Sequence, residues 1–255
     1  MTSTSSRRAS SRGQGLPEDG RRRVVITDVV PEVDRGRFPA KRTVGDDLVV
    51  EANIFADGHD ALTAVLRYRR KGERSWREEP MQPLVNDRWR GSFPLPGLGR
   101  YEFTIIAWVD HFRTWRLDLR KRLDANQDVA VELETGAQLI RAAAMRAGVS
   151  DRQKLERAAG AIVDGSVGVA DRAARALDPD LFALVLKYPD LTHATEYEQA
   201  LSVWVEPELA RFSAWYEMFP RSCAAEPGRH GTFADCEARL AYIAGMGFNV
   251  VYLPP

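Results

Sequence analysis

The chain has 255 residues, of which 44% are hydrophobic and 28% charged, and its 36 Lys and Arg residues balance its 36 Asp and Glu residues. A length of this size predicts one or two domains with a substantial core. Proteins that bind nucleic acids or anionic membranes usually carry a basic excess, so the zero net charge argues against both partners.

Cysteine usage and hydropathy exclude further classes. Cys223 and Cys236 lie 13 positions apart, without a CxxC motif or a histidine at metal-binding spacing. This predicts free thiols in a reducing cytoplasm rather than a zinc site or a disulfide framework. No apolar run approaches the ~20 residues that a bilayer-spanning helix needs. Residues 1–21 are rich in Ser, Arg and Gly without the apolar core of a secretory signal, which predicts a disordered tail.

Residues 22–124 are predicted to form most of a β-sandwich, because short alternating segments are separated by turn residues. In Asp47–Ala56, for example, Leu48, Val50, Ala52 and Ile54 share one face. The predicted strands are Arg23–Val30, Asp47–Ala56, Thr63–Arg70, Ser75–Glu79, Arg88–Leu95, Arg100–Val109 and Phe112–Leu119. The last two are expected to form a hairpin through Asp110 and His111. This spacing indicates an immunoglobulin-like or fibronectin-like sandwich.

Residues 125–198 change to a helical period and are predicted to be an inserted helical bundle. Gly148 is expected to follow the first helix as its C′ residue. Ser150 and Gln153 form a capping-box pattern for the second helix, and Asp178 precedes Pro179 as the N-cap of the fourth. The predicted helices are Thr135–Ala147, the one after Ser150, Val169–Leu177 and Pro179–Tyr188.

Segment 199–211 contains Leu201–Glu206, which again has strand character. A lone strand cannot bury both of its faces, so we expect it to re-enter the sandwich.

Residues 212–255 are predicted to form a strand, a helix and a second strand. Ala214–Phe219 and Phe248–Leu253 are apolar, and Thr232 with Asp235 forms a capping box for a helix that runs to Gly245. A βαβ unit belongs in a parallel sheet that is covered on both faces. One such unit alone would expose strand edges and apolar faces, so the sequence is expected to be cut off where a further domain begins.

The residues that follow the sandwich carry a family resemblance. Trp215–Ser222 resembles the first barrel strand of the α-amylase superfamily of glycoside hydrolases. Gly231–Phe233 and Gly245–Pro255, which ends in GFNVVYLPP, resemble its first helix and second strand. With the opening Arg23–Ile26, the Ala-rich insert and Arg211–Glu217, residues 22–255 are similar to the front of the bacterial α-1,4-glucan:maltose-1-phosphate maltosyltransferases.

The resemblance implies that residues 212–255 begin a truncated (β/α)8 barrel. It also implies a retaining transferase that moves maltosyl units from maltose 1-phosphate to the non-reducing end of an α-1,4-glucan and releases phosphate. The family's catalytic and phosphate-binding groups lie on later strands, so no residue of this chain is assigned as catalytic, substrate-binding or metal-binding, and no cofactor is expected. The resemblance further implies a cytoplasmic homodimer that assembles through the sandwich and the helical insert. The 255-residue chain itself is expected to be inactive.

Three polar residues near the predicted first barrel strand could have either a functional or a structural role. Arg221 and Ser222 lie just past the strand, where a phosphate-facing role is conceivable but a packing and turn role is favoured. Glu217 is expected to be a buried strand residue paired with an arginine inside the barrel, rather than a catalytic carboxylate.

Aromatic and imidazole side chains are the other candidates. Among aromatic rings that stack on sugars, Trp89 and Tyr101 are predicted to be core residues, whereas Trp108 and Trp115 are better candidates for a surface or an interface. Trp76 stays open. The histidines lie in turns and links without metal spacing and are expected at the surface; they are His59, His111, His193 and His230.

Two alternative functions remain open. The chain could be a non-catalytic carbohydrate-binding or dimerisation module, against which the uncovered βαβ unit argues. It could also be the front of another amylase-like enzyme, such as a branching enzyme or a maltogenic hydrolase, in which the Ala-rich insert is not typical. In either case we expect residues 22–211 to form a stable unit and residues 212–255 to be loosely held.

Overall fold

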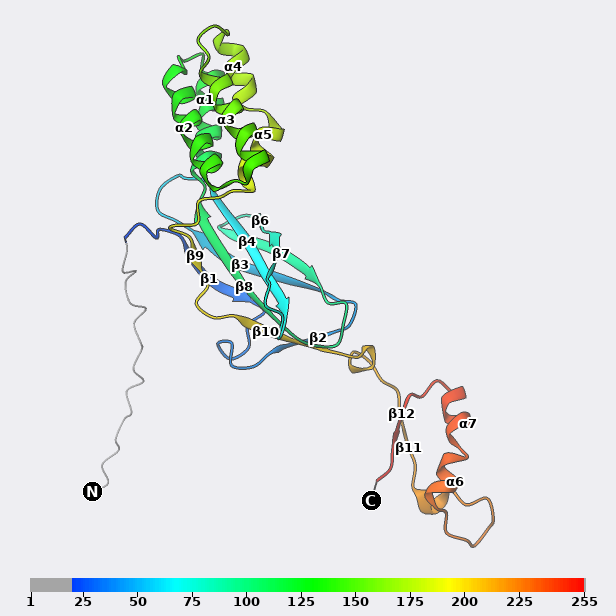
Figure 1. Ribbon diagram of the computed structural model, residues 1–255. Coiled ribbons are helices and arrows are strands. Elements are labelled where there is room, and N and C mark those ends of the chain that lie inside the picture. The colour runs from blue at the N-terminus through cyan, green and yellow to red at the C-terminus, as the bar shows by residue number, and fades with distance from the viewer. Residues whose placement is uncertain (1–19, 255) are drawn as a thin grey trace, which may run out of the picture.

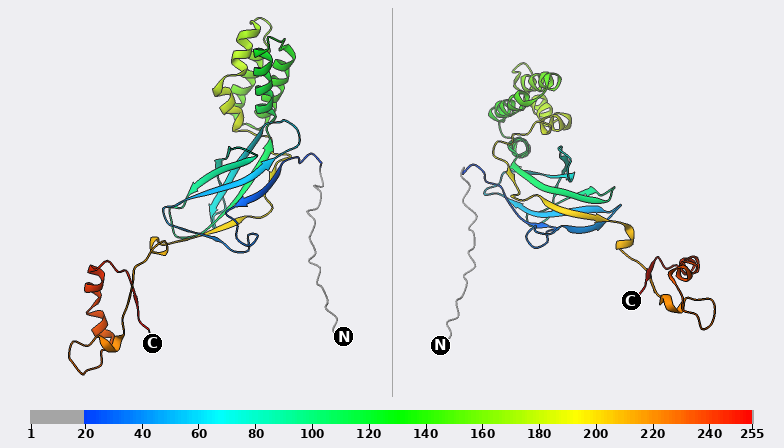
Figure 2. Two further views of the ribbon diagram at one scale, coloured as in Figure 1. Left: turned by 180° about the vertical axis from the view of Figure 1, so that it is seen from behind. Right: turned by 60° about the horizontal axis from the view of Figure 1, so that its bottom comes forward.

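The computed structural model describes residues 20–254, so nearly all of the predicted tail lies outside the described residues. It has a mixed α/β structure with two facing β-sheets, a bundle of helices and a small C-terminal α/β unit (Figure 1). The bundle lies beyond one end of the sheets and the C-terminal unit beyond the other, in both orientations of Figure 2.

The two sheets contain ten strands of the described chain. The four-stranded sheet has the order β1 (Val25–Val30), β3 (Asp47–Phe55), β7 (Arg88–Pro94), β6 (Gln82–Pro83). The six-stranded sheet has the order β2 (Ala40–Thr43), β10 (Leu201–Glu206), β8 (Gly99–Val109), β4 (Leu62–Arg70), β5 (Arg77–Pro80), with β9 (Thr195–Glu196) beside β8. Within these two sheets, only β2 and β10 pair in parallel. Six of the seven strands predicted for the first half are confirmed; β2, β6 and β9 are too short to show an alternating pattern.

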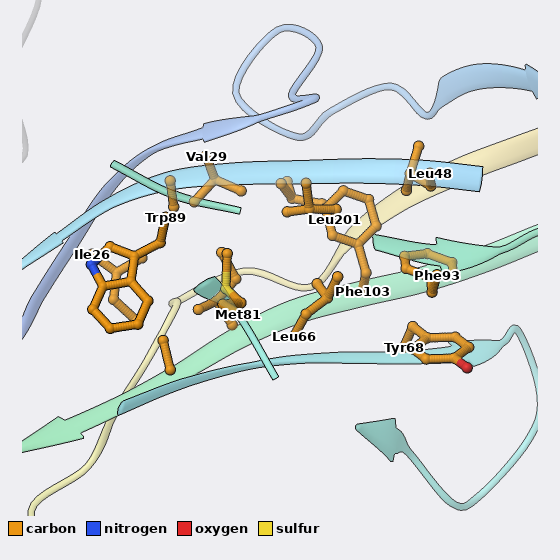
Figure 3. Packing of buried hydrophobic residues seen from close by; sticks show 14 of the residues in the cluster. Ile26, Val29, Leu48, Leu66, Tyr68, Met81, Trp89, Phe93, Phe103 and Leu201 are labelled. Carbon is orange, nitrogen blue, oxygen red and sulfur yellow. The ribbon is translucent and has the colours of Figure 1, made fainter. Parts of the chain in front are cut away.

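The core lies between the two sheets (Figure 3). Alternate residues of β3, β4, β7 and β10 point inward, as the period of 2 predicted. Leu48 and Val50 of β3 face Leu66 of β4 and Phe103 of β8, and all four are fully buried. The rings of Tyr68 and Phe93 stack with their centroids 4.3 Å apart. Trp89 and Tyr101 are buried here, so their assignment to the core is confirmed.

The predicted strand Phe112–Leu119 is wrong, because this segment lies within helix α1 (His111–Asp124). Phe112, Trp115 and Leu119 are buried at helical spacing on one face of α1. Asp110 does not turn a hairpin; its carboxylate accepts a hydrogen bond from the Arg113 backbone N–H at 2.8 Å and caps the helix.

Five helices form the bundle: α1, α2 (Ala130–Arg146), α3 (Val149–Val163), α4 (Val169–Ala176) and α5 (Pro179–Leu186). Their shared core combines large residues with many alanines, and its fully buried members include Leu119, Leu133, Ala137, Ile140, Leu155, Ala159 and Ile162. The small alanines let α2 and α3 approach closely. The apolar stripe predicted for α3 is confirmed by the burial of Leu155, Ala159 and Ile162.

The predicted cap of α5 is confirmed, whereas the predicted boundary between α2 and α3 is wrong. Asp178 caps α5 as predicted and accepts from the Asp180 N–H at 2.7 Å, with Pro179 in the first turn. The Ser150 capping box is wrong, because α3 begins at Val149 with Gly148 as its N-cap. Gly148 has φ −67°, so it does not adopt the left-handed conformation of a C′ glycine either.

After the bundle the chain returns to the sheets. The predicted strand Leu201–Glu206 is β10, and it lies between β2 and β8 in the six-stranded sheet. Before it, Tyr197 anchors the return. Its backbone N–H donates to the Ile105 carbonyl at 2.8 Å, and its hydroxyl donates to the Glu32 carboxylate at 3.1 Å.

Tyr197 makes the fold sensitive to alkaline pH. Burial, followed by the charge and the hydrogen bond of Glu32, raises the pKa of Tyr197 to about 12 from 10.0. Because the folded state favours the protonated phenol, this contribution to stability is complete below pH 10 and is lost as pH rises toward 12. We expect wild type to lose more unfolding free energy than Tyr197→Phe between these pH values, as urea titrations would measure. Parallel losses in the two proteins would contradict the role of the phenol.

The C-terminal unit follows a 3₁₀ turn, η1 (Glu208–Ala210). It contains β11 (Trp215–Glu217), η2 (Pro220–Ser222), α6 (Phe233–Glu237), α7 (Leu240–Gly245) and β12 (Val250–Tyr252). β11 and β12 pair in parallel, which confirms the predicted βαβ order. The single predicted helix is interrupted between Glu237 and Leu240, and Gly247, with φ +92°, follows its end. Within residues 20–254, no helix combines the length and apolar character needed to cross a membrane.

Candidate functional site

The carboxyl ends of β11 and β12 are one candidate location, because ligands of covered parallel sheets bind outside the carboxyl ends of the strands. Arg221 and Ser222 lie there in η2 with exposed side chains. Their backbone builds the turn: the Gly231 N–H donates to the Arg221 carbonyl at 2.9 Å, and the Ser222 N–H donates to the Phe219 carbonyl at 2.9 Å. The turn role expected for this pair therefore belongs to the backbone.

The loop from Cys223 to Thr232 is held by the predicted capping box. Asp235 accepts from the N–H and the hydroxyl of Thr232 at 2.7 and 2.8 Å, and it pairs with Arg229 at 2.7 Å. The hydrogen bonds from Thr232, and then Arg229, lower the pKa of Asp235. The carboxylate therefore stabilises the loop above the ordinary aspartate pKa, and this stabilisation is lost as pH falls through the lowered value.

Gly231 is required by the packing of this loop. A Cβ atom at this position would lie 2.7 Å from the Ala224 nitrogen and 2.9 Å from the Cys223 nitrogen, and it would press against the Pro220 carbonyl oxygen. We expect Gly231→Ala to break the hydrogen bond to Arg221 and to accelerate hydrogen exchange across residues 220–231. Gly245→Ala is the matched control, because its Cβ would meet open space. Equal exchange in both variants would contradict this packing argument.

The expected pairing of Glu217 with an arginine inside a complete barrel stays a prediction. Among residues 20–254, Glu217 is exposed and no ion pair to it is found. The reason is the strand period. Its neighbours Tyr216 and Met218 face the helices and pack with Ile243, whereas Glu217 points to the opposite face, which the helices do not cover.

Both cysteines are free, as predicted, and both are buried, which was not predicted. They pack with Met218 and Ile243 in the small core of the C-terminal unit, to which α6 contributes Cys236 and α7 contributes Ile243. Burial, and then the neighbouring Cys223 thiol, raises the pKa of Cys236, which favours the protonated and unreactive thiol at neutral pH.

The expectation that Trp108 and Trp115 lie at the surface is wrong, since each is only 7% exposed. Trp115 packs against Phe112 and donates from its indole N–H to the Glu132 carbonyl at 2.7 Å. Trp108 lines pockets of about 90 and 70 Å³ where β8 meets the bundle, and His111 and Asp190 line both of them. These volumes are well below the roughly 300 Å³ at which ligand pockets begin.

His111 and His193 line the same small pocket, whereas His59 and His230 do not. His59, His111 and His230 are exposed as expected, whereas His193 is half-buried beside Asp190. Across the described chain, no three His, Cys, Asp or Glu side chains gather in a way that would hold a metal ion.

A larger depression, of about 490 Å³, lies at the other end of the sheets. Tyr68, Tyr101, Arg70, Glu73 and Arg77 line it. Its charged groups are engaged within the protein: Arg70 donates to the Leu98 carbonyl at 2.8 Å, and Arg77 pairs with Glu73 at 3.0 Å. This leaves few polar groups to recognise a ligand.

The outer face of the six-stranded sheet carries tryptophan side chains among charged residues. Trp76 lies over this face with the Arg69 guanidinium 4.2 Å from its ring centroid, and Arg69 also pairs with Glu102 at 2.9 Å. Trp204 of β10 is 45% exposed. Trp204 was not among the predicted candidates, although its parity is opposite to that of the buried Leu201, Val203 and Val205 and marks it as outward-facing.

Comparisons with known proteins agree on one family. A family model described as α-1,4-glucan:maltose-1-phosphate maltosyltransferase, domain N/S, matches residues 22–207. Curated proteins named α-1,4-glucan:maltose-1-phosphate maltosyltransferase are similar over nearly the whole chain. The protein of Chlorobaculum tepidum is 49% identical over 94% of this chain and 35% of its own length. Those of Methylacidiphilum infernorum and Myxococcus xanthus are each 44% identical, over 94% and 91% of this chain and 36% of their own lengths. The chain thus spans about a third of these relatives.

Proposed function

The chain belongs to the α-1,4-glucan:maltose-1-phosphate maltosyltransferase family, and from this we propose that it is the N-terminal part of such an enzyme. The whole enzyme would transfer maltosyl units from maltose 1-phosphate to the non-reducing end of an α-1,4-glucan, releasing phosphate. The observation that carries the proposal is the match of residues 22–207 to domain N/S of the family, together with 49% identity to a named relative.

We propose the retaining mechanism of two carboxyl groups roughly 5–5.5 Å apart. One carboxylate attacks the anomeric carbon, the other carboxyl group donates its proton to the phosphate oxygen as the bond to that oxygen breaks, and a β-maltosyl ester forms while phosphate leaves. The other carboxylate then accepts the proton of the glucan 4-hydroxyl as that oxygen displaces the ester. We assign both groups to the rest of the barrel and none to this chain.

The proposed organisation has three parts. Residues 22–110 and 195–211 form an immunoglobulin-like sandwich, residues 111–194 are a helical insert within it, and residues 212–255 begin a (β/α)8 barrel. The predicted insert, residues 125–198, is corrected at both ends, because α1 packs in the bundle and β9 pairs with β8. The pairing of β10 with β8 and the parallel pairing of β11 with β12 support this division. Exposed apolar side chains on the C-terminal unit, among them Trp215 and Phe233, support further packing of barrel elements against it.

We also propose a cytoplasmic homodimer that forms through the sandwich and the insert. Apolar side chains exposed on the bundle, including Val131, Met145 and Val149, support an interface there. Analytical ultracentrifugation tests it directly: a dimer sediments at twice the chain mass of 28.6 kDa, and a species of 28.6 kDa at micromolar concentrations contradicts the proposal.

Phosphate release from maltose 1-phosphate tests the function. A protein that joins this chain to the remaining elements of the barrel is expected to release phosphate in step with glucan elongation, while the 255-residue chain alone releases none. Turnover by the chain alone would overturn the assignment of the carboxyl groups to later strands. Production of free reducing ends without phosphate release would instead favour a hydrolase.

A further inference from the structure

The depression of about 490 Å³ at the end of the sheets away from the bundle contains two buried tyrosines. Its volume lies within the roughly 300–1,000 Å³ of small-molecule pockets. Tyr68 and Tyr101 line it, although they are only 7% and 4% exposed. Figure 3 shows Tyr68 at one end of the core, with its hydroxyl directed away from Leu66. The two aromatic rings therefore close the core and form the inner wall of the depression.

Neither phenol hydroxyl has a hydrogen-bond partner among residues 20–254. Buried tyrosine hydroxyls usually have one, so two unpartnered hydroxyls in one depression point to a ligand. Gly97 lies beside the Tyr101 hydroxyl, where an added Cβ atom would be 3.5 Å from the oxygen, so no side chain at this position covers it. Burial, and then the charge of Glu79, raises the pKa of Tyr68, so this phenol keeps its proton at neutral pH and can donate it in a hydrogen bond.

Strand pairing brings a guanidinium to the same opening. Arg70 lies directly opposite Tyr101 in the β4–β8 pair, and it shares a strand face with Tyr68 two residues earlier. Arg70 gives one N–H to the Leu98 carbonyl at 2.8 Å, but a guanidinium has five N–H donors. It forms no ion pair among the described residues, so its charge is not neutralised.

The one carboxylate of the depression is already occupied. Arg77 donates to both oxygens of Glu73, at 3.0 and 3.2 Å, and the Arg70 backbone N–H donates to Glu73 at 3.2 Å. The few polar groups that stay available are therefore hydrogen-bond donors, and the two arginines and one glutamate leave an excess of positive charge. This combination favours an anionic ligand and disfavours a cation.

This depression is called here the tyrosine pocket, and its lining includes Tyr68, Arg70, Pro94, Pro96, Gly97 and Tyr101. We propose that the tyrosine pocket binds a small molecule through an oxyanion, which is a phosphate or a carboxylate group. The Tyr68 and Tyr101 hydroxyls and the remaining N–H groups of Arg70 donate to the oxyanion, because such charge-assisted hydrogen bonds are the strong ones.

The ligand is larger than a bare ion. A water molecule takes up about 30 Å³, so a pocket of about 490 Å³ has room for an organic body as well. The tyrosine rings and the two prolines offer that body apolar surface to pack against. The tyrosine pocket lies at the end of the sheets beyond which the C-terminal unit follows (Figure 1), and small-molecule sites occur preferentially at such domain boundaries.

The test is titration of the isotope-labelled full chain with four probes, followed by NMR. Phenyl phosphate and benzoate each join an aromatic ring to an oxyanion, whereas phenol offers the ring alone and inorganic phosphate the oxyanion alone. We expect saturable shifts of the amide signals of residues 68–73 and 94–101 with phenyl phosphate or benzoate, and the tighter of the two identifies the oxyanion. Phenol and inorganic phosphate should bind more weakly, because each lacks one recognised part.

Tyr68→Phe and Tyr101→Phe remove only the hydroxyls. Each should weaken binding of the tighter probe about tenfold, which corresponds to one hydrogen bond to a charged group. Neither should lower the temperature of thermal unfolding, because the hydroxyls bond to no other group of the described chain. Arg70→Gln should weaken binding further, since it removes the charge. Tyr242→Phe is the matched control: Tyr242 is an exposed tyrosine of α7, and this variant should bind as wild type does.

Three results would overturn the proposal. They are the absence of saturable shifts with both oxyanion probes, unchanged affinity in both tyrosine variants of the pocket, and binding of phenol as tight as that of phenyl phosphate and benzoate. The last result would show an apolar groove that does not recognise the oxyanion. The proposed function does not depend on any of them, because phosphate release from maltose 1-phosphate tests it separately.

Discussion

Gly136→Ala is expected to destabilise the helical bundle by about 3 kcal/mol, although alanine is the better helix former. An added Cβ would lie 2.5 Å from Cε2 of Trp115 and closer still to two further ring carbons. The indole has little freedom to move, because its N–H donates to the Glu132 carbonyl and its ring packs against Phe112. The steric overlap therefore outweighs the roughly 1 kcal/mol that alanine gains over glycine in a helix.

Gly160→Ala supplies the control with the opposite sign. Gly160 lies inside α3, is exposed, and has no atom within 4 Å of an added Cβ. This variant should gain about 0.5–1 kcal/mol, since only the helix propensity changes. Urea unfolding followed by far-UV circular dichroism measures both free energies. If Gly136→Ala is as stable as wild type, α2 does not pack on Trp115 as described.

Asp110→Ala is expected to cost about 2–4 kcal/mol, the second large effect. Asp110 is 6% exposed at the junction of β8 and α1. Its carboxylate accepts from the Arg113 N–H and from the Thr63 hydroxyl, each at 2.8 Å. Alanine removes the helix cap and leaves the half-buried Thr63 hydroxyl and Arg113 N–H without this acceptor, so the loss exceeds that of an exposed cap.

Asp178→Ala separates the loss of a helix cap from the additional cost that burial of the Asp110 carboxylate causes. Asp178 caps α5 through the Asp180 N–H in an exposed position, so its loss should cost only about 1 kcal/mol. Denaturant unfolding of both variants gives the comparison. Equal losses at the two positions would show that burial of the Asp110 carboxylate adds nothing to its capping role, and that the link to Thr63 is energetically neutral.

Local sequence patterns were enough to predict the buried strand faces, two helix caps and the family. Leu48, Val50 and Leu201 lie at alternate positions of their strands, and burial of one strand face follows from that period alone. The caps at Asp178 and Thr232 are equally local, because each requires one side chain and backbone N–H groups within three residues. The residues that carry the family resemblance also lie in short stretches, and the comparisons confirm the family.

Segment 112–119 shows why a local pattern can mislead. Its apolar residues fit both a period of 2 and the helical spacing of Phe112, Trp115 and Leu119. The choice depended on what lay opposite: α2 offers Gly136, where the Trp115 ring fits, and Asp110 gains the Thr63 hydroxyl from a strand 47 positions earlier. No window of neighbouring residues contains either partner.

Trp108 and Trp204 mark the division between sequence and tertiary structure. Each has the outward parity of its strand, which the sequence by itself determined. Residues from α5 and the segment after it line the pocket beside Trp108 and help to bury it, while Trp204 lies among Arg100, Lys41 and Glu206 and stays open. Parity follows from the backbone geometry of one strand, whereas exposure depends on which distant segments pack there, and only the tertiary structure decided that.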